Sequence, residues 1–120
     1  MYDHVGIKVK DLKASVAFYR AVLEPLGFEL ASQYEGGAGF GPKGAPALWL
    51  AADGGKHSGV HIAFTARSRA AVDAFHAGGL EAHGKDNGAP GVRKDYSPTY
   101  YAAFLIDPDG NNVEAVCHRG

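Results

Sequence analysis

The stretch "DHVGIKV" at residues 3–9 recurs in altered form as "VHIAFTA" at residues 60–66, and this pair decides the fold. At an offset of 57 residues, His4 aligns with His61 and the apolar positions of the two stretches coincide. Each stretch alternates apolar residues with others, which is the pattern of a strand with one buried face. The sequence therefore predicts two copies of one supersecondary unit.

A helical pattern follows each of the two stretches. In "DLKASVAFYRAVLEPLG" (11–27) and "SRAAVDAFHAGG" (68–79) the apolar residues recur at helical spacing. Asp11 and Ser68 stand where an N-cap is expected, and the second pattern predicts a helix that ends at Gly78.

Short segments separated by glycine turns follow both helices. Predicted strands lie at 27–34, 38–42 and 45–52 in the first half and at 79–84, 99–106 and 111–118 in the second. The turn "DPDGN" (107–111) is a tight connection between the last two strands. Each half is thus predicted to run β-α-β-β-β.

The predicted fold class is α+β, with two βαβββ modules that form a cupped eight-stranded sheet. The modules span about 1–53 and 57–120 of a single domain, 1–120, and residues 53–56 form a short joint between them. A module of this size is marginally stable alone. We therefore expect the modules to complete one fold, within one chain or by exchange between two, and we expect a homodimer.

The composition favours a soluble domain that binds a small molecule. With 46% hydrophobic residues, 21% charged residues and a net charge of -1, the chain has no electrostatic reason to bind nucleic acid or a membrane. The single cysteine, Cys117, excludes an internal disulfide and favours a reducing compartment. No segment has the pattern of a signal peptide or a membrane helix. We expect a cytoplasmic protein.

Two histidines and one glutamate predict a metal site. His4 and His61 occupy equivalent positions on the two first strands, each on the face opposite the apolar residues. Glu114 lies within the last strand among valine and alanine, where an unpaired carboxylate is costly to bury. Two imidazoles and a carboxylate suit Fe(II), Mn(II), Zn(II), Ni(II) or Co(II) and leave coordination positions open. The predicted cofactor is a divalent metal ion of unknown identity.

The remaining four histidines lack this support, because a histidine in a sequence is more often a surface or hydrogen-bonded group than a ligand. The residues expected to be exposed to solvent are His57, His76, His83 and His118.

Three motifs, in this order and spacing, resemble those of one known superfamily. The segments "DHVGIKVKDLKASVAFYRAVLEPLGFEL" (3–30), "GVHIAF" (59–64) and "FLIDPDGNNVEAV" (104–116) are similar to the vicinal oxygen chelate superfamily. That superfamily includes glyoxalase I, bleomycin-resistance proteins, extradiol dioxygenases and fosfomycin-resistance thiol transferases, and the likeness is greatest to small bacterial glyoxalase-like proteins. The resemblance implies paired βαβββ modules. It implies metal ligands at His4, His61 and Glu114.

A fourth ligand position of glyoxalase I departs from that pattern. On the predicted fourth strand, Trp49 looks equivalent to Glu114, whereas glyoxalase I enzymes have glutamate or glutamine there. An indole neither ligates a metal nor transfers protons, so the resemblance does not imply glyoxalase I chemistry. The His, His, Glu set instead resembles that of the dioxygenases and thiol transferases. The reaction type stays open among lyase, dioxygenase and transferase.

Trp49, Tyr100 and Arg93 are the predicted substrate-binding residues. Alternation lets only one of Tyr100 and Tyr101 face the concave side, and the resemblance favours Tyr100. Arg93 is a candidate to hold a carboxylate or phosphonate in a forked pair, and a surface arginine in a polar loop is the alternative interpretation.

Together these features predict a divalent-metal-dependent enzyme that acts on a small oxygen-chelating substrate, with catalytic residues unassigned. The alternative is a metal-free protein of the bleomycin-resistance kind that binds or sequesters a small molecule. The intact set of His4, His61 and Glu114 favours the enzyme, because such binding proteins usually lack it. A purely structural dimer module would leave the position of Glu114 unexplained.

Overall fold

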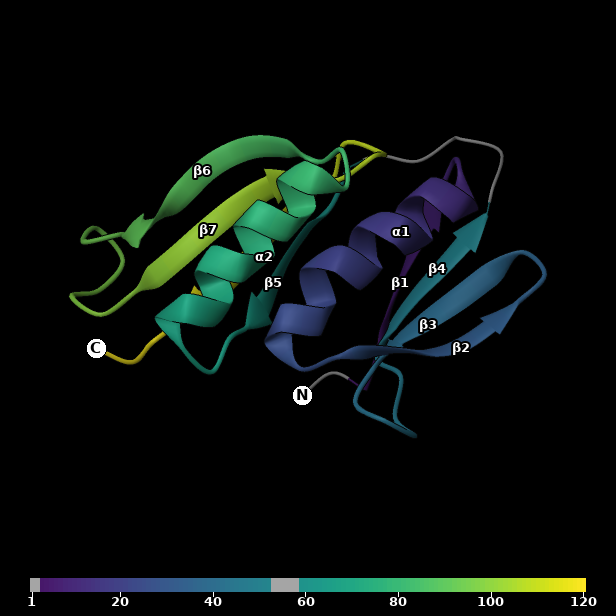
Figure 1. Cartoon of the computed structure of the whole chain (residues 1–120), viewed down its shortest axis with the longest axis horizontal. Helices are drawn as coiled ribbons and strands as arrows, with labels where there is room; N and C mark the ends of the chain where they lie inside the picture. Colours follow the sequence, from purple (N-terminus) through teal and green to yellow (C-terminus); the bar gives the residue numbers. More distant parts are fainter. Residues whose placement is uncertain (1–2, 53–58) are drawn as a thin grey trace.

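Each copy of the repeat folds as a strand, a helix and three further strands, so the two βαβββ modules are confirmed. The computed structural model describes residues 3–52 and 59–120, and the joint predicted at 53–56 lies outside these residues. The two modules lie side by side, with helices α1 and α2 next to each other (Figure 1).

The elements follow the repeat along the chain. The first module contains β1 Val5–Val9, α1 Leu12–Leu23, a 3-10 turn Glu24–Leu26, β2 Glu29–Tyr34, β3 Gly37–Gly41 and β4 Leu48–Ala52. The second module contains β5 His61–Thr65, α2 Arg69–Glu81, β6 Lys85–Val92, β7 Tyr101–Ile106 and β8 Asn112–Cys117.

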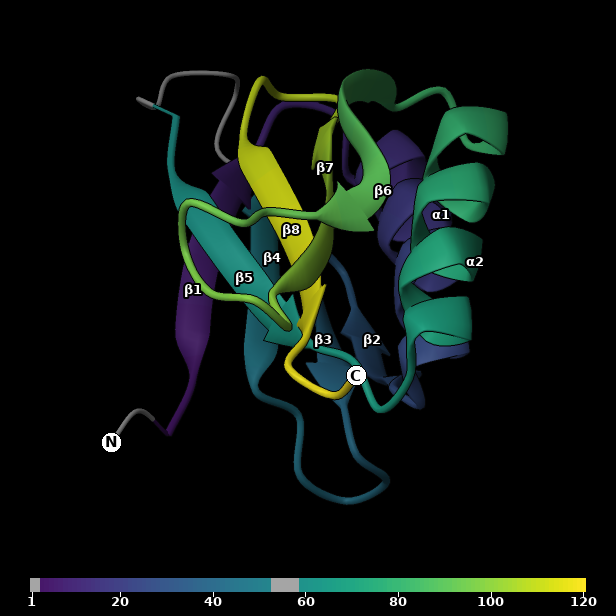
Figure 2. The same cartoon turned by 90° about the vertical axis from the view of Figure 1, so that its left-hand side faces the viewer.

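The eight strands are divided between two four-stranded sheets, in the orders β1-β4-β3-β2 and β5-β8-β7-β6. The first strand of each module pairs in parallel with its last strand, and the other pairs are antiparallel. Both helices lie on the same side of the sheets (Figure 2). Each sheet therefore has one face under its helix and one face directed away from it.

Side-chain caps start both helices, as predicted. The carboxylate of Asp11 accepts the N–H of Ala14 at 3.1 Å, and the hydroxyl of Ser68 accepts the N–H of Ala71 at 3.1 Å. Among the described residues, neither helix is long and apolar enough to span a membrane.

The predicted end of α2 at Gly78 is wrong, because the helix continues to Glu81. A Cβ on Gly78 would lie 2.8 Å from the carbonyl oxygen of Ala21 in α1. A Cβ on Gly79 would lie 2.2 Å from Leu105 in β7. These glycines serve close packing between elements rather than helix termination.

The predicted strand at 79–84 is also wrong, since β6 begins at Lys85. Its sequence "KDNGAPGV" holds two glycines and a proline, which reads as a loop. The strand lies at the edge of its sheet and its pairing with β7 shifts register twice. An edge position tolerates proline and bulges that a central strand would not.

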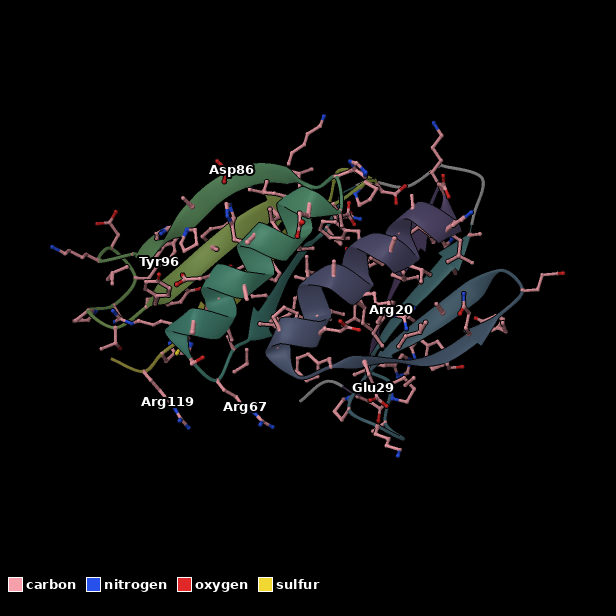
Figure 3. The ribbon with its side chains drawn as sticks, in the orientation of Figure 1. Arg20, Glu29, Arg67, Asp86, Tyr96 and Arg119 are labelled. Carbon is pink, nitrogen blue, oxygen red and sulfur yellow. The ribbon has the colours of Figure 1, made fainter. Side chains whose placement is uncertain are left out.

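His76 contradicts the expectation of exposure. Its side chain is 11% exposed, and its Nε2 lies 2.8 Å from Oδ1 of Asp86 on β6, which Figure 3 labels. The same carboxylate oxygen accepts the N–H of Gly88 at 3.0 Å. His83 and His118 are exposed as expected, and His57 lies outside the described residues.

The turn "DPDGN" is built around the buried carboxylate of Asp107. Its Oδ2 accepts the hydroxyl of Tyr19 at 2.6 Å and the side-chain amide of Asn111 at 2.8 Å. Its Oδ1 accepts the backbone N–H groups of Asp109 and Asn111 at 2.9 and 2.8 Å. Tyr19 is wholly buried in α1, so this turn of the second module is anchored in the first.

Two neighbouring side chains extend this anchor. Asp109 accepts the N–H of Lys10 at 2.7 Å and the hydroxyl of Ser15 at 3.1 Å, both at the start of α1. The side-chain oxygen of Asn111 accepts the N–H of Val60, just before β5, at 3.0 Å. The turn thereby connects β8, α1 and β5.

Replacing Tyr19 by phenylalanine should lower the free energy of unfolding by about 1–3 kcal/mol, because the buried Asp107 carboxylate loses a donor. Chemical denaturation measures the change. Tyr34→Phe, at an exposed tyrosine, is the control and should leave stability unchanged. Equal losses in both variants would contradict the structural role of the Tyr19 hydroxyl.

The pair of His76 and Asp86 predicts a pH-dependent contribution to stability. The hydrogen bond from His76, followed by that from the N–H of Gly88, lowers the pKa of Asp86 below its ordinary value of 3.8. A carboxyl with a lowered folded pKa stabilises the fold above its unfolded pKa, and the stabilisation is lost as pH falls through the folded pKa.

Asp86→Asn should therefore lower the melting temperature at pH 7, by a small amount because the carboxylate is exposed. The difference from the unmodified chain should shrink once the pH falls below 3.8. Melting curves over a range of pH measure it. A difference that stays constant down to about pH 2 would show that the charge of Asp86 is not its cause.

Candidate functional site

The face of the second sheet directed away from α2 carries most of the predicted site residues; we call it the outer face. Glu114 on β8 pairs with Ala63 on β5 and with Phe104 on β7, so these three side chains share one face. Tyr101 has the opposite parity, and its hydroxyl donates to Asp73 on α2 at 2.6 Å. The outer face is therefore the one without a helix.

His61 and Glu114 meet on this outer face. Nε2 of His61 lies 3.0 Å from Oε1 of Glu114, whose side chain is 3% exposed while that of His61 is 49% exposed. The ring of Phe104 stacks on the imidazole with centroids 6.4 Å apart and an angle of 20°. The pair thus joins a buried carboxylate to an imidazole that reaches solvent.

The contacts around this pair assign different roles to the two nitrogens of the imidazole. Nδ1 of His61 lies 3.1 Å from the carbonyl oxygen of Asn112, which only accepts, so Nδ1 carries the proton. In the neutral imidazole Nε2 then presents a lone pair to the carboxylate of Glu114. Two facing lone pairs repel unless a cation lies between or beside them. A proton or a metal ion can fill that role.

Tyr100 supports the other oxygen of Glu114. Its hydroxyl donates to Oε2, and burial first and Glu114 second raise the pKa of Tyr100 to about 12. Its ring makes edge contacts with Tyr96 at 4.9 Å and His118 at 5.3 Å. Tyr100 and Tyr101 thus point to opposite faces, as alternation predicts.

The structure does not bring His4 to the other two predicted ligands. Its side chain is 57% exposed, and its Nδ1 lies 2.7 Å from Oδ1 of Asp3. Across residues 3–52 and 59–120, no group of three or more His, Cys, Asp or Glu side chains converges as a metal site would require. One chain alone therefore provides a pair, His61 and Glu114, and a separate histidine.

Trp49 has the position in the first module that Glu114 has in the second. Gly6, two residues after His4, pairs with Trp49, just as Ala63 pairs with Glu114. The indole lies across Gly39 of β3, where an added Cβ would approach it to 2.6 Å. The glycine therefore makes room for the indole on the face of the first sheet away from α1.

Arg93 lies at the margin of the outer face. Its Nη1 donates to the carbonyl of Gly91 at 2.9 Å and its Nη2 to that of Ala89 at 2.8 Å. Its guanidinium carbon lies 5.3 Å from the centroid of Phe104. Arg93 and His61 therefore both lie beside Phe104. Tyr100 contacts Glu114, the residue that pairs with Phe104.

Sequence reasoning missed the side chains and carbonyl that orient the predicted ligands. Asp3 and the backbone of Asn112 hold the two histidines, and neither was singled out. The signal for Asn112 was present, because it shares the parity of Glu114 and lies opposite His61. The place of Asp3 next to His4 carries no such signal.

A cavity of about 200 Å³ lies where the two modules meet, and Ala63, which pairs with Glu114, is one of its lining residues. It is mainly apolar, and its lining includes Val5, Phe28, Phe40, Leu48, Ile62 and Phe64. Among the described residues, none of the predicted site residues lines it.

Comparisons with known proteins agree with this fold. A sequence model of the Glyoxalase/Bleomycin resistance protein/Dioxygenase superfamily matches residues 2–115. No curated protein sequence matches the chain significantly.

Several solved structures share the fold. A glyoxalase/bleomycin resistance protein from Albidiferax ferrireducens T118 is 30% identical, with a TM-score of 0.83 over 99% of this chain and 98% of that one. A glyoxalase/bleomycin resistance protein/dioxygenase family enzyme from Burkholderia phytofirmans PsJN is 21% identical, with a TM-score of 0.74 and 98% of each chain covered. A lactoylglutathione lyase from Agrobacterium tumefaciens is 22% identical, with a TM-score of 0.68 over 95% and 90%. The last two likenesses show the fold alone.

Tyr100→Phe should lower the free energy of unfolding by about 1–2 kcal/mol, because the buried carboxylate of Glu114 loses the hydroxyl it accepts. Urea denaturation at neutral pH measures the change. Tyr96→Phe is the matched control, since this exposed tyrosine packs against Tyr100 and its hydroxyl has no hydrogen bond within the described part of the chain. Equal stability of both variants would show that Glu114 does not depend on Tyr100.

Proposed function

Because the chain belongs to the glyoxalase/bleomycin resistance protein/dioxygenase superfamily, we propose that it is a divalent-metal-dependent enzyme acting on a small substrate with adjacent oxygens. The observation that carries the proposal is the contact of His61 Nε2 with Glu114 Oε1 at 3.0 Å. The second polar atom of each side chain also has a hydrogen-bond partner: the carbonyl of Asn112 for His61, and the hydroxyl of Tyr100 for Glu114. Hydrogen bonds of this kind orient metal ligands in proteins.

The donor set fits a divalent transition metal. A neutral imidazole and a carboxylate are ligands of Fe(II), Mn(II), Zn(II), Ni(II) and Co(II). A bound ion of this kind supplies Lewis-acid activation of substrate oxygens. His61 and Glu114 would hold it, with the ring of Phe104 stacked beside the imidazole.

We propose that His4 of a second copy supplies the third ligand. Nδ1 of His4 is engaged by the carboxylate of Asp3, as Nδ1 of His61 is engaged by a carbonyl, so Nε2 is the nitrogen through which each histidine would bind a metal. The residues of β1 and β5 that share the parity of these histidines are exposed in the single chain: Gly6, Lys8, Ala63 and Thr65. A homodimer that covers these strands would bring the two halves of the site together.

Trp49 limits the choice of reaction. It occupies the position equivalent to Glu114, so a shared site would contain one carboxylate and one indole rather than two carboxylates. An indole transfers no proton at neutral pH, which disfavours an isomerisation that needs an acid and a base at the metal. We propose a lyase, dioxygenase or transferase reaction that uses one carboxylate, with Trp49 and Tyr100 in contact with the substrate.

A metal-free binding protein is the second candidate. The indole of Trp49 lies across Gly39 with Tyr34 beside it, at a centroid distance of 6.5 Å. Aromatic side chains on an open sheet face can bind a planar molecule without a metal. In that case the pair of His61 and Glu114 is an ion pair in which a proton takes the place of the metal.

Metal analysis separates the two candidates. The chain, purified without affinity histidines, should bind a divalent transition metal, and Glu114→Gln or His61→Ala should weaken binding by more than about 100-fold. Isothermal titration with Mn(II), Ni(II) and Zn(II) and elemental analysis measure this. His83→Asn is the control, because it removes an exposed histidine from a left-handed position that asparagine accepts. Binding that is equally weak in every variant and in the unmodified chain would support the metal-free protein.

Mixing two variants tests the shared site. A heterodimer of His4→Ala and Glu114→Gln collects both changes in one site and leaves the other intact, so it should recover about half of the normal metal content. Each variant alone should bind poorly. A mixture that binds no better than its components would contradict sharing, and full binding by His4→Ala would exclude His4 as a ligand.

A further inference from the structure

Arg93 is held in one position by the chain around it. Two of its N–H groups donate to the carbonyls of Ala89 and Gly91, and its guanidinium lies over the ring of Phe104. Long basic side chains on a surface normally sample many rotamers. The side chain of Arg93 therefore loses its conformational entropy when the chain folds, before any ligand binds.

Two glycines of β6 lie against this guanidinium and leave room for it. A Cβ on Gly88 would lie 3.1 Å from Nη2 of Arg93, and a Cβ on Gly91 would lie 3.3 Å from Nη1. Gly88 has a φ of +151°, which side chains rarely adopt. The segment "GAPG" (88–91), with its two register shifts, thus presents bare backbone to the arginine.

The charge of Arg93 is not neutralised in the described part of the chain. Within residues 3–52 and 59–120, the ion pairs formed by basic side chains involve His4, Arg20, His61 and His76. Carbonyl dipoles offset a full charge only in part, and a guanidinium has more N–H donors than these two carbonyls take. A half-buried, oriented and unpaired guanidinium is a binding group for an oxyanion.

This guanidinium lies close to the proposed metal pair. It is 5.3 Å from the ring centroid of Phe104, and the ring of His61 is 6.4 Å from the same centroid, so at most about 12 Å separates them. Phe104 neighbours both groups, and Tyr100 contacts Glu114, so the side chains around them are aromatic. Both groups therefore lie within the length of one small organic molecule.

We propose that Arg93 binds the oxyanion of a small organic acid whose apolar or aromatic body lies along Phe104 towards His61. The oxyanion is a carboxylate or phosphonate, which accepts two parallel N–H groups from one guanidinium. That this acid is the substrate rests on the proposed function, whereas the anion site itself does not. Arg93 would select acids over neutral analogues of the same shape.

Binding of benzoate and phenylphosphonate to the metal-free chain tests the anion site. Saturable binding is expected, and Arg93→Gln should weaken it at least about 10-fold, the loss expected for a charge-assisted pair. Lys94→Gln, which removes the neighbouring exposed charge, is the matched control and should change affinity less than about twofold. Benzyl alcohol should bind far more weakly than benzoate. Tighter binding of one of the two acids identifies carboxylate or phosphonate as the preferred group.

A second measurement does not depend on a variant that might disturb β6. Addition of benzoate to the unmodified chain should shift the Nε–H resonance of Arg93 in a nitrogen-proton correlation spectrum. An unshifted Arg93 resonance, or equal benzoate affinity in Arg93→Gln and the unmodified chain, would overturn the proposal.

The failure of this proposal differs from failure of the metal site. Glu114→Gln should lose metal and retain benzoate, while Arg93→Gln should retain metal and lose benzoate. If only Glu114→Gln fails to lose metal, the metal site is overturned. If only Arg93→Gln fails to lose benzoate, the anion site is overturned.

Discussion

The buried carboxylate of Asp107 is the group on which the rest of the structure depends. It accepts hydrogen bonds from Tyr19, from the side chain of Asn111 and from two backbone N–H groups, so in the part of the chain that the structure describes its charge is offset without a basic partner. Since Tyr19 belongs to α1 and Asn111 precedes β8, the carboxylate fixes the last strand of the second module against the helix of the first. The position of Glu114 on β8 follows from that attachment.

Strand faces, helix starts and the tight turn could be predicted from the sequence because they depend on local patterns. The alternation of β5 predicted the face of the sheet on which His61 meets Glu114, and the same kind of alternation separated Tyr100 from Tyr101. The N-caps of both helices and the turn around Asp107 are short-range chemistry of the same kind. Each of these features involves residues within a few positions of one another.

The features that sequence reasoning got wrong depend on contacts between distant segments. Gly78 and Gly79 are typical of a helix end, but both lie inside α2, where Ala21 and Leu105 leave no room for a Cβ. The glycines and proline of the segment 88–91 are typical of a loop, yet the segment is part of the edge strand β6, which ends one residue before Arg93. His76 was expected to be exposed because its partner, Asp86, lies on β6, beyond the end of α2. No local pattern shows that these two side chains meet. In each case the meaning of the residue is set by a neighbour that no local pattern identifies.

The two modules share one fold and differ in the chemistry of their equivalent positions. At equivalent positions the first module carries His4 and Trp49, and the second carries His61 and Glu114. Among residues 3–52 and 59–120, no group of three ligands forms, so His4 does not join the pair in the second module within one chain. If a second copy completes the site, metal binding and association are linked equilibria, so the metal strengthens the dimer by the same factor by which dimerisation raises metal affinity. The exposed β1 and β5 would then be the surface through which the occupancy of the site controls the oligomeric state.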